Sequence, residues 1–133
     1  MSKMNPVVHF EMPAEDKERV KKFYTNAFGW QMQQFGPEMG DYILATTSEV
    51  GEDNFPKQRG TINGGFYPKN ESFSPHPSVV VSVDDINESI GKVKKAGGQV
   101  LGEPIDIPGI GLYVSFVDTE GNRCSMLQPS PGM

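Results

Sequence analysis

The stretch DKERVKKFYTNAFG, residues 16–29, decides the fold of this chain, because residues 85–98, DINESIGKVKKAGG, repeat its pattern. Each stretch opens on an aspartate that can cap the start of a helix. Each reaches, 13 residues later, a glycine that can end the helix in the left-handed conformation. Apolar residues recur between these two marks at helical spacing. The repetition, at a shift of 69 residues, predicts two copies of one structural module.

A strand pattern precedes each expected helix, at residues 6–12, closed by Pro13, and at residues 78–83. Successive side chains of a strand point to opposite faces, so one set should contact the helices and the other should not. The residues expected against the helices are Val8, Phe10, Val79 and Val81. The residues expected on the opposite, concave face are His9, Glu11, Ser78 and Ser125.

Three shorter strand patterns follow each helix, at 30–35, 41–46 and 61–67 in the first copy and at 99–102, 111–117 and 123–128 in the second. The order strand–helix–strand–strand–strand, twice, predicts an α+β fold of two tandem βαβββ modules. Their curved sheets should form a cup with the helices outside. We expect one domain over residues 1–133, with module one at about 5–68, a linker at about 69–77 and module two at about 78–129.

Composition excludes several classes of function. The net charge is −5, and the only concentrated basic group is Lys92, Lys94 and Lys95, so nucleic acid is not an expected partner. A single cysteine, Cys124, rules out an intrachain disulfide and fits a reducing compartment. No apolar stretch is long enough to span a membrane, and the first residues lack an apolar signal core. We therefore expect a cytoplasmic protein with no membrane partner.

Three motifs carry a resemblance to a known family: VHFEMP at residues 8–13, FYTNAFGW at 23–30 and DTEGN at 118–122. With their spacing, they resemble the vicinal oxygen chelate superfamily of glyoxalases, bleomycin-resistance proteins and extradiol dioxygenases. The resemblance covers nearly the whole chain. It implies the glyoxalase/bleomycin resistance/dioxygenase fold, a small-molecule ligand in the cup and a homodimer.

The resemblance also implies where a metal would be held, on the first and last strand of each module. The matching positions are His9, about Gly64, Ser78 and Ser125. Only His9 is a good ligand, because glycine has no side chain and a neutral serine hydroxyl binds a divalent ion weakly. We therefore expect no metal and no cofactor.

Two polar residues of the first strand are the candidates for catalysis, His9 and Glu11. His9 is either a polar anchor or general base, or an inherited and inert histidine. Glu11 either acts with His9 or lies near the rim, paired with an arginine such as Arg59 or Arg123. His76 would join them only if the strand expected at residues 78–83 began earlier and included His76. This is disfavoured because His76 lies between two prolines. The residues expected to bind a ligand are His9, Glu11, Trp30, Tyr42, Phe66, Ser78, Tyr113 and Ser125.

Two main classes of function remain open from the sequence, beside a third in which the protein serves only in interactions with other proteins. The first is a metal-free binding module that holds a small, partly aromatic molecule, as resistance-type relatives do. The second is a lyase or isomerase of glyoxalase-like lineage that works through His9 and Glu11 or through an atypical divalent metal. The sequence does not identify the ligand.

Overall fold

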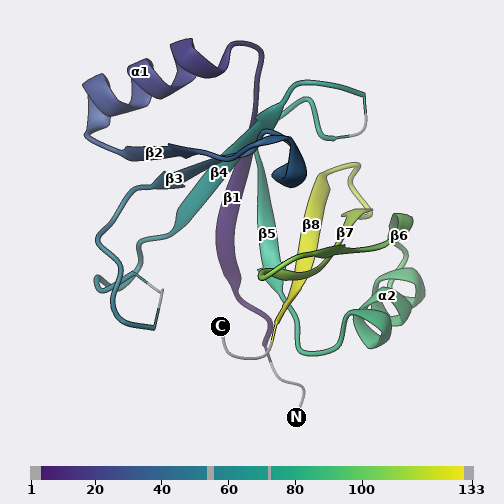
Figure 1. Ribbon diagram of the computed structural model, residues 1–133. Helices are drawn as coiled ribbons and strands as arrows, with labels where there is room; N and C mark the ends of the chain where they lie inside the picture. Colours follow the sequence, from purple (N-terminus) through teal and green to yellow (C-terminus); the bar gives the residue numbers. More distant parts are fainter. Residues whose placement is uncertain (1–3, 54–55, 72, 131–133) are drawn as a thin grey trace. The chain divides into compact units, whose positions relative to one another are not determined.

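A computed structural model describes residues 4–53, 56–71 and 73–130 (Figure 1). The chain forms two compact units, residues 9–77 and residues 4–8 with 78–130. The first module contains β1 (Val7–Ala14), α1 (Lys17–Phe28), β2 (Gln31–Gln34), a 3₁₀ turn (Pro37–Met39), β3 (Ile43–Thr46) and β4 (Asn63–Pro68). The second contains β5 (Ser78–Ser82), α2 (Ile86–Lys95), β6 (Gln99–Ile107), β7 (Gly111–Val117) and β8 (Arg123–Pro129). The fold is therefore the predicted α+β arrangement of two βαβββ modules.

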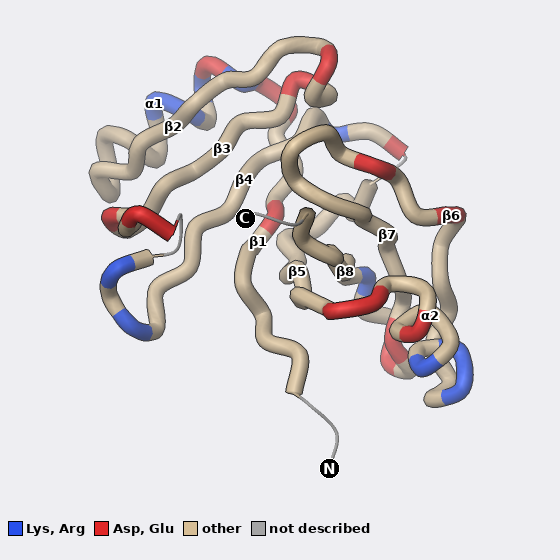
Figure 2. The backbone as a smooth tube through the Cα atoms, turned by 60° about the horizontal axis from the view of Figure 1, so that its bottom comes forward, with Lys and Arg blue, Asp and Glu red and all other residues tan. Residues whose placement is uncertain are grey.

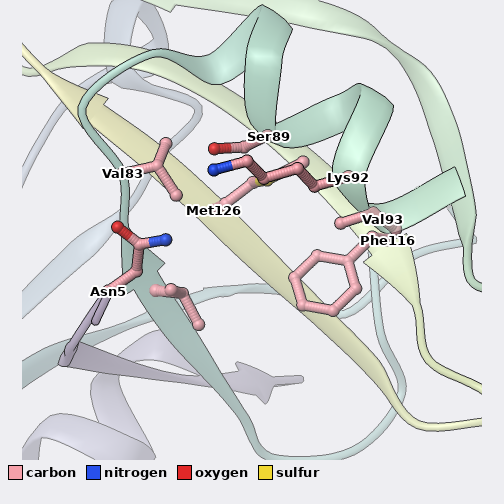
Figure 3. Close-up of a pocket in the computed structure, with 8 residues that line it drawn as sticks. Asn5, Val83, Ser89, Lys92, Val93, Phe116 and Met126 are labelled. Carbon is pink, nitrogen blue, oxygen red and sulfur yellow. The ribbon is translucent and has the colours of Figure 1, made fainter. Parts of the chain in front are cut away.

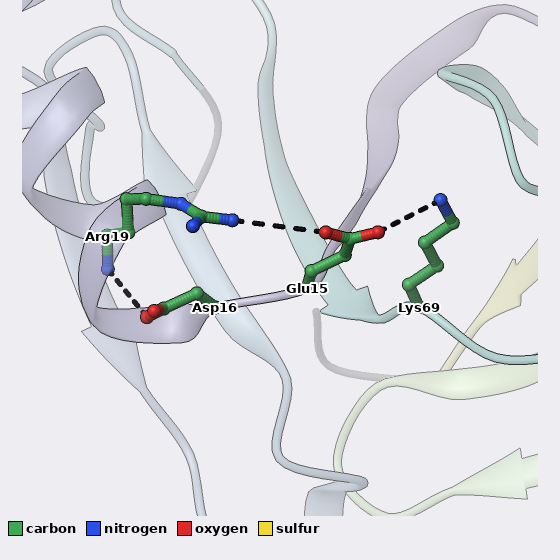
Figure 4. Close-up of polar contacts among 4 residues, drawn as sticks. All are labelled: Glu15, Asp16, Arg19 and Lys69. Carbon is green, nitrogen blue, oxygen red and sulfur yellow. Dashed lines mark hydrogen bonds and ion pairs between the residues drawn. The ribbon is translucent and has the colours of Figure 1, made fainter.

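Both helices begin at the predicted aspartates. Asp16 Oδ1 accepts a hydrogen bond from the backbone N–H of Arg19 at 3.0 Å, and this bond lowers the pKa of Asp16. Next to this cap, Glu15 lies 4.0 Å from Arg19 and 3.2 Å from Lys69, so one carboxylate links α1 to the residue after β4 (Figure 4). These contacts fix the entry of the chain into α1.

The second helix starts at the predicted aspartate and ends slightly earlier than the spacing implied. Asp85 Oδ1 accepts from two backbone N–H groups, those of Asn87 and Glu88, at 3.1 Å each. Glu88 Oε1 lies 3.3 Å from Lys92 Nζ, one helical turn on, as an exposed ion pair. The left-handed glycine after α2 is Gly97, with φ 101°, and not Gly98 as the 13-residue spacing implied. The helix therefore ends earlier than its counterpart, which ends at Gly29 with φ 73°.

The two modules have the same strand order. In the first it is β2-β3-β4-β1 and in the second β6-β7-β8-β5, with the first and last strand of each module parallel and the others antiparallel. In the parallel ladders, Glu11 is paired with Gly65, and Val80 with Ser125. These pairs define equivalent positions in the two modules, because residues in register share a face of the sheet.

Two strands are longer than the sequence indicated. β1 continues past Pro13 to Ala14, which is in register with Pro68. A proline removes one N–H donor from a strand but keeps its extended φ and its carbonyl, so it need not end the strand. β6 continues to Ile107, across an irregularity between Leu101 and Ile105. Gly102, with φ 82°, lies in this irregularity and supplies a conformation that other residues rarely adopt.

Each helix covers one face of its own sheet. Beneath α1 lies a core of aromatic and aliphatic residues: Phe10, Met12, Ala14, Val20, Tyr24, Trp30, Met32, Ile43, Ala45 and Phe66. Beneath α2 lies a mainly aliphatic core: Val81, Val83, Ile86, Ile90, Val93, Val100, Leu112, Val114, Phe116 and Met126. Phe10 and Val81 thus face the helices as predicted. Val79 is 37% exposed and lies outside the core of the described residues.

Candidate functional site

The first strand presents two polar side chains on the face of the sheet opposite α1. His9 and Glu11 alternate with Phe10 and Met12, which are packed in the core beneath the helix. Glu11 is only 7% exposed. The pairing of Glu11 with Gly65 places the glycine on this same face. We call this surface, formed by His9, Glu11, Tyr42 and Gly65, the His9 face.

Tyr42 connects the two polar residues of β1. Its hydroxyl lies 2.9 Å from His9 Nε2, and it donates a hydrogen bond to Glu11 Oε2 at 3.4 Å. A tyrosine hydroxyl has one hydrogen to donate, and an ionised carboxylate can only accept. When Tyr42 donates to Glu11, His9 must therefore carry its hydrogen on Nε2 and donate it to the Tyr42 oxygen. The order of donation is then His9, Tyr42, Glu11.

His9 is uncharged at neutral pH. Burial lowers its pKa from 6.5 to about 4, because removal from water penalises the imidazolium form. A neutral imidazole is suited to a fixed hydrogen-bonding role. It is also able to accept a proton, although its low pKa makes it a weak base near neutrality.

Gly65 makes room for the tyrosine. A Cβ atom at this position would overlap the Tyr42 ring and hydroxyl. A Cβ atom at Gly64 would instead meet the ring of Phe10, on the α1 side of the sheet. The position on the His9 face is therefore Gly65, and the expectation of about Gly64 was wrong by one residue. A Gly-Gly pair inside a strand pattern indicates close approach by another group, a signal that the sequence analysis did not use.

The second module carries hydroxyl groups at the equivalent positions. Tyr113 OH lies 2.7 Å from Ser125 Oγ, which lies 3.3 Å from Ser115 Oγ. Tyr113 lies two residues before Ser115, and Ser115 is in register with Ser125. In the first module, Tyr42 lies two residues before Leu44, and Leu44 is in register with Gly65. The two tyrosines are thus equivalent.

Ser125 and Ser115 are buried, at 4% and 9% exposure, and Ser115 was not among the expected site residues. Ser78, the first residue of β5, is half-buried. It lies two residues before Val80 in the strand, so the two side chains point to the same face, and Val80 is in register with Ser125. Ser78 therefore lies on the same face of the second sheet as the hydroxyl cluster, as predicted.

Several candidate residues lie elsewhere. Trp30 stacks on Tyr24, with ring centroids 4.7 Å apart, and Phe66 is 1% exposed in the same core. Both belong to the layer between α1 and its sheet, so the expectation that they line a ligand site was wrong. Phe66 is in register with Met12, a residue of the helix side. His76 is exposed in the segment before β5, outside any strand, so it does not join His9 and Glu11 in one strand pattern.

Comparisons with known proteins agree with the fold. A family model described as bleomycin resistance protein-like N-terminal matches residues 7–48. A glyoxylase-like domain-containing protein of Didymella fabae is 33% identical over 115 residues, which cover 84% of each chain. The chain belongs to the vicinal oxygen chelate superfamily.

More distant members of the superfamily add two further comparisons. A protein of Arabidopsis thaliana named probable lactoylglutathione lyase is 28% identical over 121 residues, covering 87% of this chain and 33% of that protein. The chain thus spans about a third of that relative. The crystal structure of methylmalonyl-CoA epimerase from Mycobacterium tuberculosis superimposes with a TM-score of 0.67 at 12% identity, over 94% of this chain and 88% of that one. This likeness shows the common fold.

The residues of this superfamily member do not fit the divalent metal that the family implies. Of the matched positions, His9 offers an imidazole, Gly65 offers no side chain, and Ser78 and Ser125 offer only neutral hydroxyls. Glu11 is near His9, but the Tyr42 hydroxyl bonds to both. Among residues 4–53, 56–71 and 73–130, no three histidine, cysteine or acidic side chains form a group that could hold an ion.

In that same part of the chain, neither helix is long and apolar enough to cross a membrane.

Proposed function

We propose that this protein binds a small molecule on the His9 face without a divalent metal. The supporting observation is the hydrogen-bonded series His9, Tyr42, Glu11. It offers a neutral ring, a phenol and a buried carboxylate to one ligand. In metal-dependent relatives the ion would organise the ligand oxygens. Here fixed hydrogen-bonding groups take that place, which is the usual means by which small-molecule sites orient polar ligands.

The expected ligand is a small polar molecule with a flat or partly aromatic portion. Tyr42 supplies both a ring face and a hydroxyl, and its ring lies 6.5 Å from that of His9 at an interplanar angle of 20°. A ligand with a hydrogen-bond donor would be suited to Glu11, since a carboxylate accepts. Trp30 and Phe66 do not contribute, because both are packed beneath α1.

The binding proposal is tested by a nuclear magnetic resonance screen of an aromatic fragment library. We expect hits that shift the signals of His9 and Tyr42 and that lose affinity in Tyr42→Phe. Tyr24→Phe is the matched control, since Tyr24 lies in the core beneath α1. Hits that map only to other surfaces, or that bind Tyr42→Phe equally well, would contradict the proposal.

A second function, a metal-independent isomerase or lyase, is favoured by one observation. Glu11 is buried at 7% exposure and hydrogen-bonded to a phenol. A carboxylate in such surroundings can serve as a base while Tyr42 supplies a proton. Solvent deuterium exchange into α-hydroxy and α-keto acid substrates, compared between the wild type and Glu11→Gln, separates this function from binding alone. Deuterium exchange that occurs in the wild type and is lost in Glu11→Gln would show that the protein is an enzyme.

A further inference from the structure

A half-open cavity lies in the second module, on the opposite side of the sheet from the hydroxyl cluster. It has a volume of about 140 Å³ and lies between α2 and the sheet beneath it. Its lining residues are Asn5, Val81, Val83, Ser89, Lys92, Val93, Phe116 and Met126. For comparison, an engineered cavity of about 150 Å³ with apolar walls binds benzene. The volume is thus sufficient for one ring or one branched alkyl group.

The duplication explains why this cavity exists. A shift of 69 residues matches the helix cap Asp16 to the helix cap Asp85. By the same shift, the position equivalent to Tyr24 in the second module is Val93. In the first module the Tyr24 ring stacks on Trp30 at 4.7 Å and lies 5.1 Å from Phe66. The second module has only the short Val93 side chain at this place. This valine and the Phe116 ring both line the cavity beneath α2.

The same shift replaces two more apolar residues by polar ones. It carries the half-buried Val20 onto Ser89, and Phe23, which is 57% exposed, onto the exposed Lys92; both Ser89 and Lys92 line the cavity. Here a hydroxyl and an ammonium group stand on the helix face that borders an apolar space, which is the composition of an amphipathic binding site.

The polar groups gather at one end of the cavity. Figure 3 shows the Ser89 hydroxyl, the Lys92 ammonium and the Asn5 amide directed toward the end near Val83, while Phe116 forms the other end. Lys92 forms an exposed ion pair with Glu88 at 3.3 Å, and such a pair is weak enough to exchange for another anion. Lys94 and Lys95 follow Lys92 in the last turn of α2, which makes this end of the helix cationic (Figure 2).

We propose that this cavity binds a small monocarboxylate with one ring or a branched alkyl group. The apolar group lies among Val81, Val93 and Phe116, and the carboxylate faces Lys92 and Ser89. Three observations support this occupant: the volume, the apolar walls, and the cationic and hydroxyl groups at one end. The site is separate from the His9 face and does not depend on the function proposed there.

Benzoate is the probe that tests the proposal, with benzyl alcohol as the neutral probe of similar size. Both are titrated into ¹⁵N-labelled protein by nuclear magnetic resonance. We expect millimolar benzoate affinity, with shifts at Ser89, Val93 and Phe116. Lys92→Gln should weaken benzoate binding about three- to five-fold, the range for one exposed charge contact. Lys94→Gln, on the same helix turn but outside the lining, is the matched control and should weaken benzoate binding by less than Lys92→Gln does.

Two filling variants complete the test. Val93→Tyr restores the residue of the first module and should abolish benzoate binding, and Ser89→Val should weaken it while changing the packing less. Thermal unfolding of both variants confirms that they fold. The proposal is overturned if benzoate produces no saturable shifts, if benzyl alcohol binds as tightly as benzoate, or if a folded Val93→Tyr variant still binds benzoate. In the last case the ligand would lie elsewhere on the surface.

Discussion

The hydroxyl of Tyr42 lies 2.9 Å from Nε2 of His9, and the same hydroxyl donates to Glu11. These three groups come from two separate segments, since His9 and Glu11 belong to β1 and Tyr42 precedes β3. Gly65 on β4 leaves the space that the tyrosine ring occupies. On the His9 face, the Tyr42 phenol thus links a neutral imidazole to a buried carboxylate.

Removal of the bridging hydroxyl should destabilise the protein. Tyr42→Phe leaves His9 and the buried Glu11 without this partner, and we expect a loss of about 1 kcal/mol in the free energy of unfolding. Urea denaturation measures the difference. Tyr24→Phe is the control, because the Tyr24 hydroxyl makes only a 3.8 Å contact with the Met12 sulfur, and its loss should change stability by less than about 0.5 kcal/mol. Equal effects of the two substitutions would contradict the described bridge.

The stability of the protein should fall between pH 6.5 and pH 4 because of His9. The folded-state pKa is about 4, against 6.5 for an unperturbed histidine. The unfolded chain therefore binds the proton first as the pH falls, and the stability that is fully present above pH 6.5 decreases down to pH 4. The largest expected loss is about 3 kcal/mol.

Urea denaturation across this pH window measures the effect. His9→Gln should flatten the profile, whereas His76→Gln, at the exposed histidine, should leave it unchanged. Both variants keep the same carboxylates, so the comparison removes the contribution of acidic groups such as Asp118, whose pKa is lowered by hydrogen bonds from Asn122 and Glu120. A profile of His9→Gln identical to the wild type would show that His9 is accessible to water.

The two neighbouring glycines of β4 should respond differently to alanine. Gly64→Ala places a methyl group against the Phe10 ring within the core and should destabilise the protein by about 1–3 kcal/mol. Gly65→Ala places it against the far end of the Tyr42 side chain, which can move. We therefore expect a smaller loss of stability and a large change in the His9 imidazole resonances. A large imidazole change in Gly64→Ala alone would reverse the assignment of the two faces.

The helix caps offer a fourth pair of matched variants. Asp85 accepts two backbone N–H groups and Asp16 accepts one. Asp85→Ala and Asp16→Ala should each lower the free energy of unfolding by about 1 kcal/mol, with the larger loss at Asp85. Denaturation of both variants at one pH decides the order. A larger loss at Asp16 would contradict this order. It would indicate that the ion pairs of Glu15 with Arg19 and Lys69 depend on the Asp16 cap.

Local sequence patterns were sufficient to predict the elements of this fold. Helical spacing and the Asp caps located both helices within a few residues, and alternation identified all eight strands. The boundaries at Pro13 and Gly102 were placed too early, because both residues interrupt a pattern that tertiary pairing nevertheless continues. Such pairing is not encoded within a few neighbouring residues.

The candidate site was predicted less completely. His9, Glu11 and Tyr42 come together, but the position expected at about Gly64 was out of register by one residue. A shift of one residue reverses the face of every side chain in a strand, so Gly64 lies on the α1 side and Gly65 on the His9 face. Phe66 was expected at the site as an aromatic side chain, and its register with Met12 places it on the α1 side. The register became evident only from the pairing of Glu11 with Gly65.

The central claim, that the His9 face works without a divalent metal, is tested most directly by calorimetric titration. Chelator-stripped protein is titrated with zinc, nickel and manganese, beside His9→Ala. We predict no binding that depends on His9 at micromolar metal, because one imidazole with glycine and serine hydroxyls cannot offset the lost hydration of the ion. Micromolar or tighter binding that disappears in His9→Ala, equivalent to about 8 kcal/mol or more, would contradict the account.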